Sequence, residues 1–304
     1  MDAHRTRQGV IFAFIAYLIW GIAPAYFKLI KQVPADEILT HRVIWSFFFM
    51  LVLLSVSRSW GDVRRVLAQP KKIGMLLITA LLVGGNWLIF IWAINHNHIL
   101  EASLGYFINP LVNVVLGMLF LRERFRSLQW FAVALAFAGV LVQVWVFGSV
   151  PVIAIGLSLT FAFYGLLRKK IGVDSQTGML IETLWLLPVA GIYLFFIAHS
   201  QTSNLAANPW SLDLLLMAAG IITTIPLLFF TAAAARLKLS TLGFFQYLGP
   251  TLMFLLAVVF YGETVNTSQL ITFGFIWVGL LCFISDALYT QGRLRRGRSG
   301  HSAA

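Results

Sequence analysis

Long runs of apolar residues, separated by short polar links, make up almost the whole chain. A helix needs about 20 apolar residues to cross the hydrocarbon of a bilayer. The pattern therefore predicts an all-α integral membrane protein with ten transmembrane helices. The expected spans are Gln8–Phe27, Asp36–Val56, Ile73–Asn95, Ile99–Leu121, Leu128–Phe147, Val152–Leu167, Thr177–Ala198, Leu212–Ala235, Leu239–Tyr261 and Gln269–Leu288.

One stretch of the first half recurs in the second half. SLGYFINPLVNVVLGMLFLRERF (Ser103–Phe125) resembles TLGFFQYLGPTLMFLLAVVFYGETV (Thr241–Val265), with the same Leu-Gly-aromatic-Phe opening, and from the prolines onward the offset is 140 positions. The same offset pairs Pro110 with Pro250, Glu123 with Glu263, Gln129 with Gln269, Gly139 with Gly279 and Trp45 with Trp185. We interpret this as an internal duplication, with one copy at residues 1–148, a second at 149–290 and a basic tail at 291–304.

Each copy is expected to hold five spans. Because five is odd, the second copy enters the membrane from the opposite face, so the helices are expected to form two inverted five-helix repeats. Secondary transporters with this architecture place the substrate site at mid-bilayer, where bent or broken helices of the two halves meet. Pro110 and Pro250 each lie near the middle of a span, and proline kinks a helix. We expect a kink at both prolines; the alternative is that both kinks are purely structural.

The distribution of charge supports a membrane protein and sets its orientation. The chain is 60% hydrophobic and 11% charged, with a formal net charge of +11. All but three of the 22 Lys and Arg residues fall at the two ends or in alternate links, and cytoplasmic loops carry such an excess. Both termini are therefore expected in the cytoplasm. Membrane topology accounts for the positive charge, so no nucleic-acid partner is expected.

The runs IAYLIWGIAPAYFK and EILTHRVIWS, with the paired Pro-to-Glu stretches and the ten spans, resemble a known family. The whole chain resembles the EamA-type proteins of the drug/metabolite transporter superfamily, and their RarD-like branch in particular. The resemblance implies a ten-helix inverted-repeat carrier of the bacterial cytoplasmic (inner) membrane that exports small metabolites or drugs. The halves differ where Ile181-Glu182 stands in place of His41-Arg42, so the site is expected to be asymmetric.

Arg42 and Glu182 are ionisable residues expected inside spans. Such a side chain costs at least about 2.5–3.5 kcal/mol on insertion scales, so each needs a partner or a wet cavity. Two interpretations stay open. The two residues pair with each other or with the backbone as a structural lock, or Arg42 binds the anionic end of a substrate while Glu182 carries a proton during transport. Arg42 is also close enough to the outer end of its span to snorkel outward.

Aromatic and amide side chains are plentiful at similar depths. They can stack on and orient a planar organic molecule, or else serve only in packing and interhelical hydrogen bonds. The candidates are Trp45, Asn86, Tyr106, Asn109, Trp185, Gln246 and Tyr247. Glu123 and Glu263 lie at span ends, where a carboxylate can accept from the free amides of a helix start. We expect these two glutamates to be structural or gate-forming.

These features favour a secondary transporter that works by alternating access on a small-molecule substrate, as a monomer or weak homodimer in the lipid bilayer. A membrane channel is the alternative, but neither a ring of like charges nor a carbonyl filter is evident. An integral-membrane enzyme is less favoured, because no cluster such as His-Glu-x-x-His is present. The single Cys282, and a His96/His98 pair without an evident third ligand, predict no metal site, and no cofactor is expected.

Overall fold

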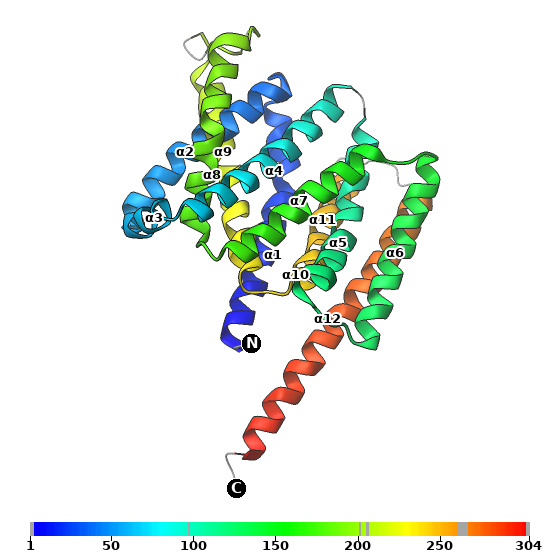
Figure 1. Ribbon diagram of the computed structural model, residues 1–304. Helices are drawn as coiled ribbons and strands as arrows, with labels where there is room; N and C mark the ends of the chain where they lie inside the picture. The colour runs from blue at the N-terminus through cyan, green and yellow to red at the C-terminus, as the bar shows by residue number, and fades with distance from the viewer. Residues whose placement is uncertain (1–2, 97, 201, 205–206, 261–266, 302–304) are drawn as a thin grey trace.

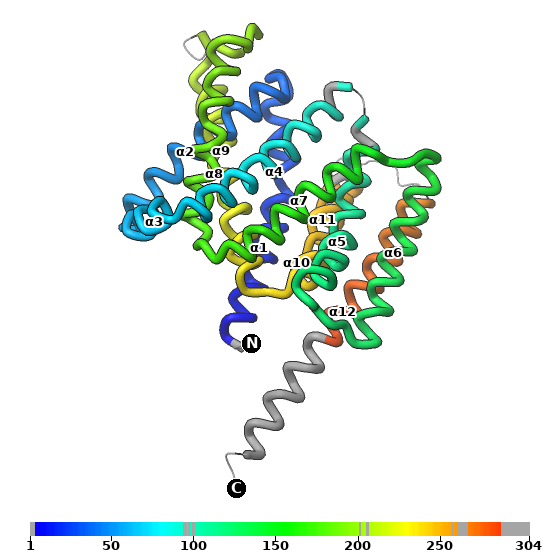
Figure 2. The backbone as a smooth tube through the Cα atoms, in the orientation of Figure 1, coloured from blue at the N-terminus to red at the C-terminus, as the bar shows by residue number. Residues whose placement is uncertain are grey.

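The computed structural model describes residues 3–96, 98–200, 202–204, 207–260 and 267–301, and every regular element in these ranges is helical. Figure 1 labels the elements, and Figure 2 follows the same backbone as a tube. The elements are α1 (Ala3–Leu29), α2 (Ala35–Ser57), α3 (Trp60–Leu67), α4 (Pro70–Asn95), α5 (Ile99–Leu121), α6 (Ser127–Phe147), α7 (Val152–Ile171), α8 (Ser175–Ile192), η1 (Tyr193–Ile197), α9 (Trp210–Ala234), α10 (Leu239–Gln246), α11 (Leu248–Leu255), η2 (Leu256–Phe260) and α12 (Thr267–His301).

The ten predicted spans are confirmed. Within the described ranges, ten helical segments are long and apolar enough to cross a membrane, so the chain is a multi-pass membrane protein. The seventh span joins α8 to the π-helical turn η1, and the ninth joins α10, α11 and η2. The short helix α3 was not predicted, because its eight residues lie in a polar link between spans.

Helices of the first half pack against the same main neighbours as their counterparts in the second half, with the two halves interchanged. α1 packs against α9 and α11, and its counterpart α7 packs against α4 and α5. In the same way α2 packs against α9 while α8 packs against α4, and α5 meets α10 between the halves. The largest buried cluster draws on both halves, including Tyr17 and Met50 from the first and Tyr164 and Phe230 from the second. This pattern supports the expected repeat.

α6 and α12, the last helix of each copy, lie side by side at one edge of the molecule (Figure 1). A Cβ on Gly139 would meet the carbonyl oxygen of Thr272 at 3.2 Å, and one on Gly279 would meet that of Ala132 at 3.0 Å. The second contact is the first shifted by 140 positions, with the partners exchanged. Since the higher-numbered residue of α6 faces the lower-numbered residue of α12, the helices run antiparallel. Antiparallel packing of equivalent helices supports the inversion.

The two prolines lie in different local structures. The ninth span is interrupted at Tyr247, three residues before Pro250, where α10 ends and α11 begins. Proline lacks the N–H that would bond to the carbonyl of Gln246. In contrast, α5 continues through Pro110. Here α10 crosses so closely that a Cβ on Gly243 would lie 2.9 Å from the Pro110 carbonyl oxygen.

We predict that Gly139→Leu and Gly279→Leu each destabilise the protein, because a side chain at either position collides with the backbone of the facing helix. Overpacking typically costs about 1–3 kcal/mol. Thermal unfolding in detergent should show similar falls in Tm for the two variants. Gly274→Leu, on α12 with nothing within 4 Å of its Cβ, is the matched control and should unfold with the parent. Equal Tm values for all three variants would contradict the predicted packing.

Candidate functional site

A cavity of about 240 Å³ lies between helices of the two halves. α1, α2, α4 and α5 line it from the first half, and α7, α10 and α11 from the second. Seven of the 19 residues that line it are aromatic, with Trp20, Trp87, Phe90 and Phe161 among them. Neither tryptophan was among the residues expected at the site, because ten tryptophans in an apolar chain carry no signal that separates cavity walls from lipid-facing positions.

The structure divides the candidate residues into two groups. Those that line the cavity are Arg42, Asn86, Tyr106, Asn109, Gln246 and Pro250. Those that lie outside its lining are Trp45, Pro110, Glu182, Trp185 and Tyr247. The backbone of Trp45 packs on Gly220 of α9, and Trp185 is 41% exposed on the outer surface of α8. Tyr247 is buried, and its hydroxyl donates to the carbonyl of Phe107 at 3.2 Å.

Arg42 reaches the cavity from α2 and does not snorkel outward. Its Nε donates a 2.8 Å hydrogen bond to Oγ1 of Thr223 on α9. That hydroxyl in turn donates to the carbonyl of Ala219 at 2.7 Å, so it is oriented to accept from Arg42. The guanidinium lies 4.7 Å from the ring centre of Trp87, within the range of cation–π attraction. Thr223 was missed from the sequence, where nothing distinguishes it from other threonines.

A chain of amides links α5 to α10 beside the cavity. Nδ2 of Asn113 donates to Oδ1 of Asn109 at 3.1 Å and to Oε1 of Gln246 at 2.9 Å. Asn86 connects α4 to α7 in a similar way, since its Nδ2 donates to the Leu157 carbonyl at 2.8 Å and to Thr160 at 2.9 Å. These bonds join the two halves and fix which polar atoms of the amides remain for a ligand.

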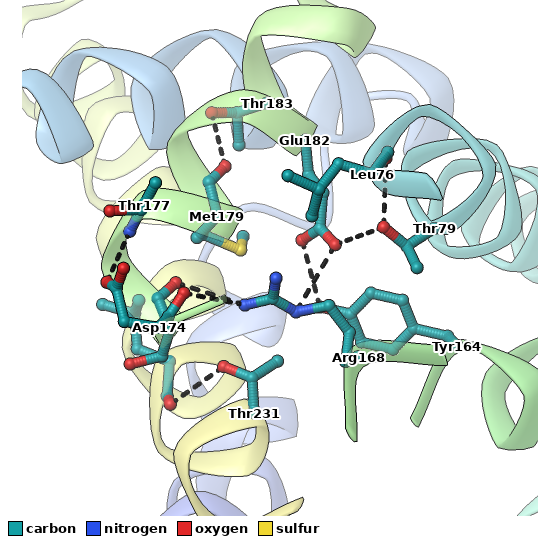
Figure 3. A network of polar contacts seen from close by, with 12 residues as sticks. Leu76, Thr79, Tyr164, Arg168, Asp174, Thr177, Met179, Glu182, Thr183 and Thr231 are labelled. Carbon is teal, nitrogen blue, oxygen red and sulfur yellow. Dashed lines mark hydrogen bonds and ion pairs between the residues drawn. The ribbon is translucent and has the colours of Figure 1, made fainter. Parts of the chain in front are cut away.

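Glu182 is paired with Arg168, not with Arg42. The Glu182 Oε1 to Arg168 Nε distance is 3.5 Å, and both side chains are 1% exposed. The hydroxyl of Thr79 donates to Glu182 Oε1 at 2.6 Å, and that of Tyr164 donates to Oε2 at 3.3 Å. Figure 3 shows this network, which joins α4, α7 and α8. Of the interpretations left open by the sequence, a structural pair between Arg42 and Glu182 is contradicted, and proton coupling at Glu182 stays a prediction.

Arg168 was missed because it heads a run of three basic residues at a span end, which the sequence indicated as cytoplasmic charge. The helix continues to Ile171 and turns Arg168 inward, one turn after Tyr164 on the same face. Its Nη2 also donates to the carbonyls of Asp174 and Ser175, both at 3.4 Å. A Cβ on Gly178 would overlap the guanidinium, so the absence of a side chain there makes room for Arg168.

Glu123 caps the start of α10 from the other half of the chain. Its carboxylate accepts from the backbone N–H of Leu239 at 2.6 Å and from that of Ser240 at 3.1 Å. It also accepts from the Ser240 hydroxyl at 2.5 Å. The first amides of a helix lack internal partners and favour a negative charge, which explains the contact. Its counterpart Glu263 lies outside the described residues.

The turn between α9 and α10 is held by two further cations. Lys169 of α7 donates to the carbonyls of Ala234, at 2.8 Å, and of Leu237. Arg5 of α1 donates to the Ala235 carbonyl at 3.1 Å. Together with Glu123, these contacts hold α1 and α7 against the turn between α9 and α10. We name Glu123, Lys169, Arg5 and the turn 234–240 the α9–α10 clasp.

A model described as the EamA-like transporter family matches the chain twice, over residues 7–145 and 149–285. Protein RarD of Salmonella typhi is 70% identical over 291 residues, which cover 96% of this chain and 99% of that protein. An uncharacterized transporter of Vibrio cholerae is 60% identical over 98% of each chain. A crystal structure of a protein with 17% identity matches with a TM-score of 0.71, over 90% of this chain and 96% of its own, which shows the shared fold.

We predict that Glu182→Gln lowers the free energy of unfolding by about 3–5 kcal/mol, because it leaves the buried guanidinium of Arg168 without its carboxylate. Adding Arg168→Gln should restore much of the loss, whereas adding Arg42→Gln should not. Asp62→Asn, which breaks the exposed pair with Arg65, is the control and should cost less than about 1 kcal/mol. Thermal unfolding of the purified variants measures all four. Rescue by the Arg42 change instead would contradict the pairing seen here.

Proposed function

The chain belongs to the EamA-like transporter family, and from this premise we propose that it is a secondary carrier that exports a small organic molecule across the bacterial inner membrane by alternating access. The observation that carries the proposal is the cavity between the two halves, at the depth where the ninth span is interrupted between α10 and α11. Carriers built from inverted repeats bind substrate at such a place. The names of the family and of the Vibrio relative are those of transporters, not of enzymes.

The charge pattern supports cytoplasmic termini, and this orientation assigns a face to each end of the cavity. Phe27 near the end of α1 and Ala102 near the start of α5 both line the cavity, which therefore extends toward the outer surface. The α9–α10 clasp then lies at the cytoplasmic surface. In this proposal the structure is the state closed to the cytoplasm, and release of the clasp opens the inner side.

Blocking the cavity tests the proposed site. Gly249 is buried, lines the cavity and has nothing within 4 Å of a Cβ atom placed on it, so Gly249→Leu puts its side chain into the cavity without a clash at the Cβ. Proteoliposomes loaded with an isotope-labelled bacterial metabolite extract should release at least one compound faster than empty liposomes do. Gly249→Leu should reduce that release at least tenfold, and Gly274→Leu, which adds the same side chain outside the cavity, should not. The proposal is overturned if no compound is released faster than from empty liposomes. It is also overturned if the parent and both variants release the compound at the same rate.

Weakening the clasp tests the alternating-access step. Glu123→Gln keeps an acceptor but removes the charge, and a hydrogen bond to a charged group is worth about 1.5–3 kcal/mol, or about tenfold or more in a population. In a Cys282→Ala background, Ala234→Cys places a thiol at a fully buried position of the clasp itself. We predict that Glu123→Gln raises its reaction rate with an impermeant thiol reagent about tenfold, from the cytoplasmic side only.

Asp62→Asn serves as the control for the loss of one surface carboxylate, and it should leave the reaction rate unchanged. An increase seen only from the outer side would reverse the proposed orientation. An unchanged rate in Glu123→Gln would remove Glu123 from the gate.

A further inference from the structure

We propose that the cavity selects small organic monoanions, namely carboxylates attached to an apolar or aromatic body. This inference rests on the proposed function for transport, but it concerns which molecule the cavity accepts, so binding tests it independently of flux. Four features of the cavity carry it: the charge of its lining, the geometry of Arg42, the orientation of its amides, and its size.

Arg42 is the one charged residue in the lining that the structure describes. No Asp or Glu of the described chain forms an ion pair with it. A cation at membrane depth needs a partner, and the buried Arg168 shows how this fold supplies one when the pair is internal. The lining of the cavity holds no such carboxylate. A ligand with one negative charge supplies the missing partner.

Two nitrogens of the Arg42 guanidinium are available for a two-point contact. Thr223 occupies the Nε, and the central carbon of the group lies 4.7 Å from the ring centre of Trp87. No other hydrogen bond from Arg42 occurs within the described part of the chain, so Nη1 and Nη2 remain as donors. A planar fork of two N–H donors matches the two oxygens of a carboxylate. A phosphate monoester carries more charge than this single cation neutralises.

The amides add donors for oxygen atoms of the ligand. Because Asn113 donates to the side-chain oxygen of Asn109, the NH₂ group of Asn109 is left to face a ligand. Asn86 uses its NH₂ on α7 and offers only its oxygen. The cavity thus presents more donors than acceptors. An ammonium group meets no carboxylate here and is repelled by Arg42, which disfavours free amino acids and amines.

The volume limits the size of the body. A cavity of about 150 Å³ holds one benzene ring, so about 240 Å³ holds a ring or branched chain with a short acid arm. The walls formed by Trp20, Phe90 and Phe161 suit an apolar face. Drug-sized ligands fill about 300–1,000 Å³ and exceed this space.

Binding of matched probes to the purified protein in nanodiscs tests the inference. The probes are labelled 3-phenylpropanoate, its neutral amide, 3-phenylpropylamine, phenylalanine and phenyl phosphate, and equilibrium dialysis gives each Kd. The carboxylate should bind at least tenfold more tightly than every other probe. Arg42→Gln should weaken carboxylate binding by about ten- to a hundredfold, the range for a lost charged hydrogen bond, and change amide binding by less than threefold. Arg42→Lys keeps the positive charge but loses the planar pair of N–H donors. Its Kd for the carboxylate should lie between those of the parent and of Arg42→Gln.

Arg65→Gln, on the exposed surface of α3, is the control for loss of one positive charge and should bind the carboxylate as the parent does. The inference is overturned if the amide, the amine or phenylalanine binds as tightly as the carboxylate. It is also overturned if carboxylate binding is absent or survives Arg42→Gln. If phenyl phosphate binds more tightly than 3-phenylpropanoate, the inference of a carboxylate is overturned in favour of a phosphoryl ligand. The proposed function fails separately, by the lack of any release from proteoliposomes that Gly249→Leu suppresses.

Discussion

In a bilayer, a polar group that the protein does not satisfy has no water to bond to, and this constraint favours the pairing of buried polar side chains. Arg168 and Glu182 form a buried ion pair, and Thr79 and Tyr164 donate to the carboxylate. Glu123 satisfies the free amides that begin α10. Arg42 is satisfied only in part, by one threonine and one aromatic face. The contrast separates residues that hold helices together from a residue that awaits a ligand.

The ten spans and the duplication could be predicted from the sequence because both depend on local or linear properties. Span length follows from the apolar runs, and the repeat from a constant offset. The partners of Arg42 and Glu182 could not be predicted in the same way. The two residues hold equivalent positions in the two copies, but equivalent residues contact each other only where they lie beside a symmetry axis. Arg42 instead bonds Thr223, and Glu182 pairs with Arg168. The sequence also does not show which face of α2 points toward the cavity. Arg42 lines the cavity, whereas Trp45, one turn along α2, packs outside its lining.

The glycines show where that axis passes. Gly139 and Gly279 make the same backbone contact on facing helices, which agrees with an axis between α6 and α12 in the proposed inverted repeat. Away from it the halves diverge, as the prolines illustrate. Pro250 follows a broken helix at the cavity wall, whereas Pro110 lies in a continuous helix beneath a close crossing at Gly243. A duplicated sequence signal therefore predicts two kinks of one kind, but neighbouring side chains decide what each proline does.

α10 joins the site to the clasp. It is eight residues long, or about 12 Å at the rise of an α-helix, and the break at Tyr247 separates it from α11. Glu123 holds its first turn, while Asn113 bonds Gln246 at its last residue. In the proposed mechanism, a shift of α10 at its cavity end displaces the amides that Glu123 accepts from. Coupling between distant sites needs a physical element that both contact, and α10 contacts both here.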